Sequence, residues 1–208
     1  MRFPFFLAFA LLPACGVVQS STGMVPEWSR DWHRVATEYD RTRLRDWRKS
    51  FTDALASART AGHSTEINRE GVLLDPDAAL GGSPIPNGMY ACRVIKVGAK
   101  SPGMLDYVSY PPFVCRVRQE RDLQGFAKMT GSQRQVGLVF PGDAVRQVFL
   151  GTLVLGDERE AMQYGQDKTR DVAGYVERIG PNRWRLVMPA PAFESKVDVI
   201  ELVPVSSD

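Results

Sequence analysis

Three polar clusters in the second half of the chain carry the side chains best suited to binding chemistry. The first lies in KMTGSQRQVG, residues 128–137, where Thr130, Ser132 and Arg134 surround Gly131. The backbone N–H groups of such a turn, together with a guanidinium, can hold an anion. The same residues also suit a hairpin turn in which Gly131 takes a positive φ. We prefer the turn and keep the anion site as a candidate.

The second cluster is a long charged connection, GDEREAMQYGQDKTRD, at residues 156–171. Long loops on a rigid β scaffold are frequent binding sites, so Asp167, Lys168 and Arg170 are candidate ligand contacts. A solvated cap with internal ion pairs is the preferred alternative. The acids match no EF-hand spacing, so the sequence predicts no calcium site. The charged side chains of this connection include Asp157, Glu158, Glu160, Asp167, Lys168, Arg170 and Asp171.

The third cluster consists of three arginines around one predicted hairpin. Arg178, Arg183 and Arg185 lie close in sequence to Trp184. Arginine and tryptophan together suit an anionic or aromatic ligand, because the guanidinium donates in a fork and both side chains stack. The preferred alternative places the arginines on a polar outer face, with Trp184 on the inner face. The three arginines are kept as candidate binding residues.

Groups that could perform catalysis are scarce. The only histidines are His33 and His63, so the β-rich remainder of the chain has no imidazole for a triad or a zinc site. No nucleophile elbow, zincin, P-loop or dinucleotide-binding motif occurs in a suitable context. We therefore expect no enzymatic activity, no cofactor and no metal. One catalytic alternative stays open, a glycan hydrolase that uses two acids among Glu158, Asp167 and Asp171.

The cysteines Cys92 and Cys115 lie in two β-like runs, MYACRVIKV and PFVCRVRQE. Side chains on adjacent antiparallel strands come close enough for a disulfide. The bond would close a loop of about 23 residues and stabilise the fold by about 3 kcal/mol in the loop-entropy model. A redox or metal site is the alternative, but neither a C-x-x-C spacing nor a nearby histidine supports it. The pair is expected to be a structural disulfide.

The N-terminus reads MRFPFFLAFALLPAC, which is one basic residue, an apolar run and then Cys15. This order predicts a signal peptide over residues 1–14, and the run is shorter than the about 20 residues of a membrane-spanning helix. The stretch before Cys15 is similar to a bacterial lipobox, in which the cysteine is lipidated, although Pro13 is unusual there. Cleavage by an ordinary signal peptidase is the alternative. Residues 15–26 would form the lipid-anchor cysteine and a flexible tether.

The expected compartment and the net charge of the chain limit the classes of partner that the sequence predicts. No aspartate follows Cys15 as a signal for retention in the inner membrane, so we expect a periplasmic protein anchored to the outer membrane. A membrane partner through the lipid anchor is therefore predicted. The formal net charge of +2 gives no basic field, so no nucleic-acid partner is expected. Residues 27–208 are long enough for one globular domain.

The domain is expected to be helical over residues 27–62 and β over residues 88–204. Thr37 and Asp40 form a capping box, and an apolar stripe follows at helical spacing until Gly62, which predicts one long amphipathic helix. Short β-like runs then alternate with turn residues. We expect a mainly β fold, an antiparallel meander that closes into a small barrel or a sandwich. The predicted strands are 89–97, 113–119, 125–130, 133–140, 146–155, 172–179, 183–188 and 197–203.

Several segments together resemble one bacterial family of exported proteins, domain of unknown function 4893. The segments that carry the resemblance are the helix with Leu44 and Trp47, EGVLL at 70–74, Tyr90 with Cys92-Arg93, Phe113 with Cys115-Arg116-Val117, TGSQR at 130–134, FLGT at 149–152, ERIG with RWRLV at 177–187 and ESKVDVIELVP at 194–204. They cover nearly the whole chain after the tether. The resemblance implies no activity and assigns no catalytic residue.

The expected function is that of a non-enzymatic module of the cell envelope that binds a small molecule or lipid. Its site is expected in the interior of the barrel or at the mouth near residues 156–171. The main alternative is a protein–protein interaction module, such as an inhibitor of an envelope hydrolase. The glycan hydrolase is the third possibility.

Overall fold

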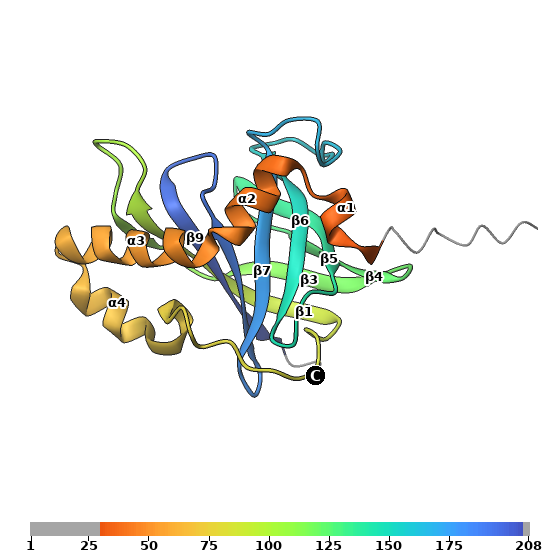
Figure 1. Cartoon of the computed structure of the whole chain (residues 1–208), viewed down its shortest axis with the longest axis horizontal. Coiled ribbons are helices and arrows are strands. Elements are labelled where there is room, and N and C mark those ends of the chain that lie inside the picture. The colour runs from red at the N-terminus through yellow and green to blue at the C-terminus, as the bar shows by residue number, and fades with distance from the viewer. Residues whose placement is uncertain (1–29, 206–208) are drawn as a thin grey trace, which may run out of the picture.

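The structure is a computed structural model that describes residues 30–205. The predicted signal peptide, Cys15 and the tether lie outside the described residues. Nine strands form one sheet. Figure 1 shows how the sheet is arranged. The strands are β1 (Gly88–Ala99), β2 (Tyr107–Ser109), β3 (Phe113–Glu120), β4 (Leu123–Lys128), β5 (Gln133–Phe140), β6 (Arg146–Leu155), β7 (Asp171–Gly180), β8 (Arg183–Pro189) and β9 (Ser195–Pro204).

Eight of these strands close into an antiparallel barrel. Strands β3 to β9 pair in chain order, β3 also pairs with β1, and β9 returns to β1. The closing pair β1–β9 runs from Tyr90 opposite Pro204 to Ala99 opposite Ser195, so no long sheet edge stays open there. The predicted mainly β fold is therefore confirmed, and the barrel is the form that it takes.

The short strand β2 is an addition that the sequence did not predict. It pairs with β1 at Ile95–Val97, beyond the stretch Gly88–Cys92 that pairs with β3. β2 and β3 thus follow one another along the same side of β1. Pro111 and Pro112 stand between them, and proline has no N–H to donate to a ladder. The two prolines account for the interruption.

Apolar side chains fill the interior of the barrel. They alternate along each strand with outward-facing residues, as a pleated strand requires. The interior cluster contains Ile85, Tyr90, Cys92, Val94, Cys115, Val117, Phe126, Val139, Phe149, Val176, Trp184, Leu186, Met188, Ile200 and Leu202. Cys92 and Cys115 form the predicted disulfide between β1 and β3, with a Cα–Cα distance of 5.8 Å. The strand register places them diagonally, with Tyr90 opposite Cys115.

Helices cover one side of the barrel, as Figure 1 shows. They are α1 (Trp32–Val35), α2 (Glu38–Arg45), α3 (Trp47–Thr60), α4 (Ser64–Glu70) and the 3₁₀ turn η2 (Gly71–Leu74). A second core lies between this layer and the outer faces of β1, β8 and β9. Its members include Phe51 and Ala54 from α3, Leu73 from η2, and Ile95 and Val199 from the barrel.

The single long helix predicted up to Gly62 is divided at Asp46. Asp46 has φ −91° and ψ 10°, and its N–H donates to Thr42 O, which ends α2 before α3 begins. The division lets α2 pack on β7 while α3 follows β1 and β9 around the barrel. Thr37 does cap α2, since its Oγ1 accepts from Asp40 N at 3.1 Å. The Asp40 carboxylate does not complete the capping box, because it pairs with Arg43.

Candidate functional site

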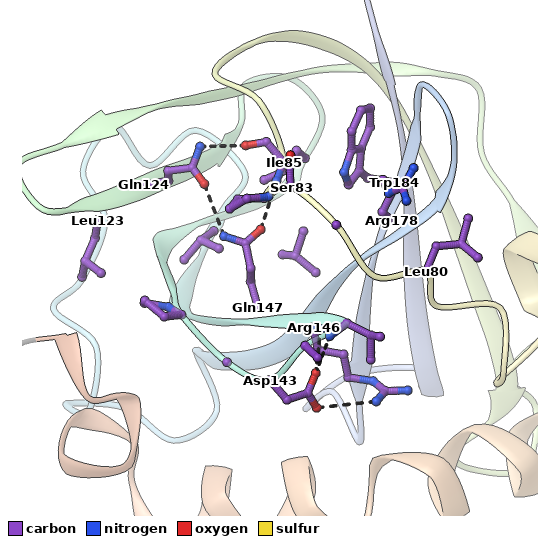
Figure 2. Close-up of a pocket in the computed structure, with 18 of the residues that line it drawn as sticks. Leu80, Ser83, Ile85, Leu123, Gln124, Asp143, Arg146, Gln147, Arg178 and Trp184 are labelled. Atoms are coloured by element: carbon purple, nitrogen blue, oxygen red, sulfur yellow. Dashed lines mark hydrogen bonds and ion pairs between the residues drawn. The ribbon is translucent and has the colours of Figure 1, made fainter.

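A pocket of about 470 Å³ opens at the end of the barrel where the β3–β4, β5–β6 and β7–β8 connections converge (Figure 2). This end is opposite to the 156–171 connection, which joins the far ends of β6 and β7. The interior of the barrel is packed with side chains, so this pocket lies at the mouth, neither inside the barrel nor near residues 156–171, where a ligand site was expected. Its apolar wall contains Leu80, Ile85, Val139, Val145, Val176 and Trp184.

Residues 80–87, which we call the strap, cross this mouth. Leu80 N donates to Arg178 O at 2.8 Å, and Ile85 is 2% exposed inside the barrel mouth. Gln147 Oε1 accepts from Ile85 N at 3.1 Å, and Gln124 Nε2 donates to Ile85 O at 2.7 Å. Two glutamines thus hold the strap by its main chain, as Figure 2 shows. An apolar anchor and a few hydrogen bonds fix the segment across the opening.

The wall of the pocket beside the strap presents Arg178 and Trp184, which are direct cross-strand partners in β7 and β8. One residue of β7, Ile179, separates Arg178 and Gly180, but their partners Trp184 and Arg183 are adjacent in β8. This is a β-bulge at Ile179, and it changes which side chains share a face. The bulge lies between the Arg178–Trp184 pair and the hairpin turn. The regular ladder of β7 and β8 places this arginine and this tryptophan together at the mouth.

Two N–H groups of this pair have no hydrogen-bond partner among the described residues. They are Arg178 Nε and Trp184 Nε1, both buried, and Trp184 is only 5% exposed. Arg178 Nη2 donates to Gly81 O in the strap. A buried donor without a partner costs about 1–3 kcal/mol, so such donors are uncommon unless another molecule satisfies them. The two N–H groups mark this wall as a place for an acceptor.

The strap lies directly against the guanidinium. Gly82 has φ +125°, and a Cβ placed there would lie 3.1 Å from Arg178 Nη2 and 3.4 Å from Nε. A larger residue at this position would therefore occupy the space beside the guanidinium. On the other side, the ring of Tyr90 meets Trp184 edge-on at a centroid distance of 6.3 Å. Tyr90 also donates to Pro86 O at 2.6 Å, and burial raises the pKa of its hydroxyl to about 12.

The other two arginines of the third cluster point away from the pocket. Arg183 donates to Glu201 at 2.7 Å. Arg185 is fully buried under the helical layer and pairs with Glu177 at 2.6 Å. Of the three arginines grouped in the sequence, the structure brings only Arg178 into the pocket, together with Trp184.

The TGSQR cluster is a turn at the opposite end of the barrel. Gly131 has φ +89°, as expected for the hairpin. Thr130 Oγ1 accepts from Val114 N at 3.0 Å, which joins the turn to β3. Arg134 donates to the carbonyl oxygens of Gly156 and Glu158 at 2.8 and 2.6 Å. The guanidinium of Arg134 is therefore occupied by carbonyl oxygens. Ser132 is exposed beside it.

The 156–171 connection is stabilised by contacts between its own residues. Arg170 makes two hydrogen bonds to the carboxylate of Glu158, at 2.8 and 2.9 Å, and lowers the pKa of Glu158 to about 2. Asp167 accepts from Thr169 N at 2.8 Å, while Lys168 is exposed. Asp171 is buried beneath the loop and accepts from Gly165 N at 2.9 Å. These contacts agree with the interpretation of the 156–171 connection as a solvated cap with internal ion pairs.

A buried charged cluster, which the sequence did not reveal, closes the barrel at this same end. Lys96 Nζ lies 3.2 Å from Asp198 and 3.0 Å from Glu194. Burial raises the pKa of Asp198, while burial alone would lower the pKa of Lys96 and the two acids more than offset this. Gln133 accepts from Lys96 at 3.1 Å. The buried lysine is paired with acids, which is how buried charges persist.

The strap and its two glutamines were also absent from the candidate residues. The one available signal was Ile85, an apolar residue between Pro84 and Pro86 in an otherwise polar loop. Gln124 and Gln147 carry no pattern that distinguishes them from surface glutamines. Within residues 30–205, no group of three or more His, Cys, Asp and Glu side chains could hold a metal ion. Over the same range, no helix is both long and apolar enough to span a bilayer.

These features define a small protein built on one closed antiparallel barrel, with a disulfide, a helical flank and a donor-lined pocket at one mouth. The chain belongs to the family described as Domain of unknown function (DUF4893), whose model matches residues 32–202. This match agrees with the family that the sequence resembles. Comparison with curated proteins gives no match, and comparison with solved structures gives none.

Proposed function

We propose that this protein is an exported, lipid-anchored barrel that binds a small molecule in the pocket at the strap end. The observation that carries the proposal is the pair of unpartnered N–H groups, Arg178 Nε and Trp184 Nε1, on the wall of a pocket of about 470 Å³. Ligand pockets commonly have volumes of about 300–1,000 Å³ and combine apolar walls with a few placed polar groups. The pocket has both properties.

Export and anchoring are supported by the N-terminal sequence and by the cysteines. The apolar run before Cys15 has the length and order of a signal peptide. Disulfides persist in oxidising compartments, so the bond between Cys92 and Cys115 agrees with a periplasmic location. Removal of the first fourteen residues would leave Cys15 at the N-terminus, where a lipid would hold the barrel at the membrane.

The binding proposal is tested by a thermal-shift screen of lipids, glycan fragments and small hydrophobic molecules. Ala144 lines the rim of the pocket and is exposed, so Ala144→Trp should fill the opening without disturbing the core. Ala161 is exposed at the other end of the barrel, and Ala161→Trp is the matched control. We expect a ligand that raises the melting temperature of the wild type and of A161W but not of A144W. A screen in which no compound shifts the wild type would overturn the proposal.

A protein–protein interaction module, such as an inhibitor of an envelope hydrolase, is the second candidate, and an exposed apolar patch favours it. Val114 and Val203 lie on either side of Ala91 on the outer faces of β3, β9 and β1, with Met89 nearby. These residues are exposed, and contiguous apolar patches often mark protein interfaces. Val114→Asp should abolish a partner captured from envelope extract, whereas A144W should not. The opposite pattern would rule out this patch as the interface.

A further inference from the structure

The pocket contains a guanidinium whose charge is not paired with an acid in the part of the chain that the structure describes. Around the same hairpin, Arg183 pairs with Glu201 and Arg185 pairs with Glu177. Arg178 instead donates to the carbonyl oxygen of Gly81, and its Nε–H is left over. A carbonyl oxygen satisfies one N–H but does not neutralise the charge. The charge of Arg178 therefore has no acid partner at a half-buried position, although Asp122 and Asp143 also line the pocket.

A second donor lies on the same face. Trp184 is the direct cross-strand partner of Arg178, and its Nε1–H is buried and unpartnered. An indole nitrogen can only donate, and an arginine can only donate. A ligand group that satisfies both must therefore accept hydrogen bonds. Because one of the donors is charged, an anionic acceptor gains more from this pair than a neutral acceptor does.

The rest of the pocket wall suits an apolar body. Val139, Val145 and Val176 contribute side chains from β5, the β5–β6 connection and β7, and Ile85 contributes one from the strap. The nearby carboxylate of Asp143 is held by its own loop, since Oδ1 accepts from Val145 N at 2.9 Å and from Arg146 N at 2.8 Å. The donors and the apolar wall thus occupy different parts of one pocket.

We propose that the ligand is a compact amphiphile with an anionic oxygen group, either a carboxylate or a phosphate. This group accepts hydrogen bonds from Arg178 Nε and Trp184 Nε1. The apolar body of the ligand lies against Val139, Val145 and Val176. This inference rests on the proposed binding function and specifies the chemical class of the ligand. It also gives the strap a role, because Gly82 and Gly81 lie against the guanidinium that the anion reaches.

The test uses three ligands with one apolar skeleton, titrated calorimetrically into the full-length mature protein. They are 4-phenylbutanoate, 3-phenylpropyl phosphate and 4-phenylbutanamide. We expect at least one anion to bind about tenfold or more tightly than the amide, as charged hydrogen bonds imply. The two anionic arms show whether the headgroup is a carboxylate or a phosphate. Equal binding by all three ligands would overturn the anion inference and leave the binding function standing, whereas no binding by any of them would count against both.

Variants test whether Arg178 and Trp184 cause the preference for an anion over the amide. Arg178→Gln should reduce the ratio of anion affinity to amide affinity to about one. Trp184→Phe keeps a ring but removes the N–H, and should reduce the ratio several-fold. Arg183→Gln is the matched control, because Arg183 bonds Glu201 outside the pocket, and it should leave the ratio unchanged. A ratio that is the same in all four proteins would overturn the assignment.

One readout does not depend on any variant at Arg178. The indole N–H proton of Trp184, assigned by its absence in W184F, should shift downfield in NMR spectra when the preferred anion is added to the wild type. The amide should move it less. An indole signal that does not move while the anion binds would exclude Trp184 from the site.

Discussion

Arg185 and Glu177 face each other across β7 and β8, and both side chains are fully buried. Arg185 Nη2 lies 2.6 Å from Glu177 Oε2. Its Nη1 donates to the carbonyl oxygens of Leu73 and Asp75 at 2.8 and 2.7 Å, at the end of η2. One guanidinium thus joins the helical layer to the outer wall of the barrel. Glu177 also accepts from Arg146 at 2.6 Å.

The first prediction concerns this buried pair. Arg185→Met removes one partner and leaves the Glu177 carboxylate and the carbonyl oxygens of η2 under-satisfied. We expect the free energy of unfolding to fall by about 3–5 kcal/mol, the usual effect of breaking a buried pair. Denaturation in urea measures it. Arg183→Met is the control, since Glu201 keeps Arg93 at 2.9 Å, and it should cost less than about 1 kcal/mol. Equal losses in both variants would contradict the role given to Arg185.

The second prediction concerns the disulfide. The double variant Cys92→Ala/Cys115→Ala should lose about 3 kcal/mol of unfolding free energy, because the unfolded chain is no longer closed into a loop. The two cysteines are 23 residues apart. Dithiothreitol should destabilise the wild type by a similar amount and have no effect on the double variant. A reductant effect that persists in the double variant would show that another cysteine is responsible.

The strands were predictable because short β-like runs stand between clear turn residues. Trp184 was expected to face inward, and it lies in the barrel core together with Leu186 and Met188. The sequence could not show that the opposite face would also be buried. Arg185 was expected on a polar outer face, yet helices and η2 cover it. Alternation identifies two faces of a strand but does not tell which elements will pack on them.

The pocket was harder to predict, because it depends on the pairing of residues and on packing distant in sequence. Arg178 and Trp184 share a face because the β7–β8 register makes them cross-strand partners, and the bulge at Ile179 means that this register cannot be counted back from the turn. Asp46 ends α2 for a comparable reason, since the two helices must follow different strands of a curved barrel. Local patterns predicted the elements, whereas the site arises from their register and curvature.

The third prediction concerns Lys128, which lies inside the barrel and is 3% exposed. Its Nζ donates to Thr130 O at 2.8 Å and to Gln133 O at 2.9 Å. Burial, assisted by the positive charges of Arg134 and Lys96, lowers the pKa of Lys128 from 10.5 to about 8. Between these two pH values the unfolded chain binds more protons than the folded chain. The fold should therefore become more stable as the pH rises through this window, and lose that gain as the pH falls back from about 10.5 to about 8.

For a pKa shift of this size, the free energy of unfolding should rise by at most about 3 kcal/mol. Urea denaturation at several pH values between 7.5 and 10.5 measures it. Lys128→Met should flatten the rise, because the titrating group is gone. Lys168→Met, at an exposed lysine, should leave it intact. A wild type whose stability is constant over this range would show that Lys128 keeps its ordinary pKa.

The last prediction concerns the membrane anchor. Cys15 follows an apolar run in a stretch similar to a lipobox, and it lies outside the described residues. We expect bacteria that express the full-length chain to incorporate labelled palmitate into it, and Cys15→Ala to abolish the label. The double variant Cys92→Ala/Cys115→Ala should keep it, because those thiols form the disulfide in the barrel. The unusual Pro13 makes this test informative, since Pro13→Ala should preserve or increase labelling if the stretch is processed as a lipobox. A wild type that is exported and cleaved but unlabelled would mean that an ordinary signal peptidase acts here. The barrel would then be free in the periplasm.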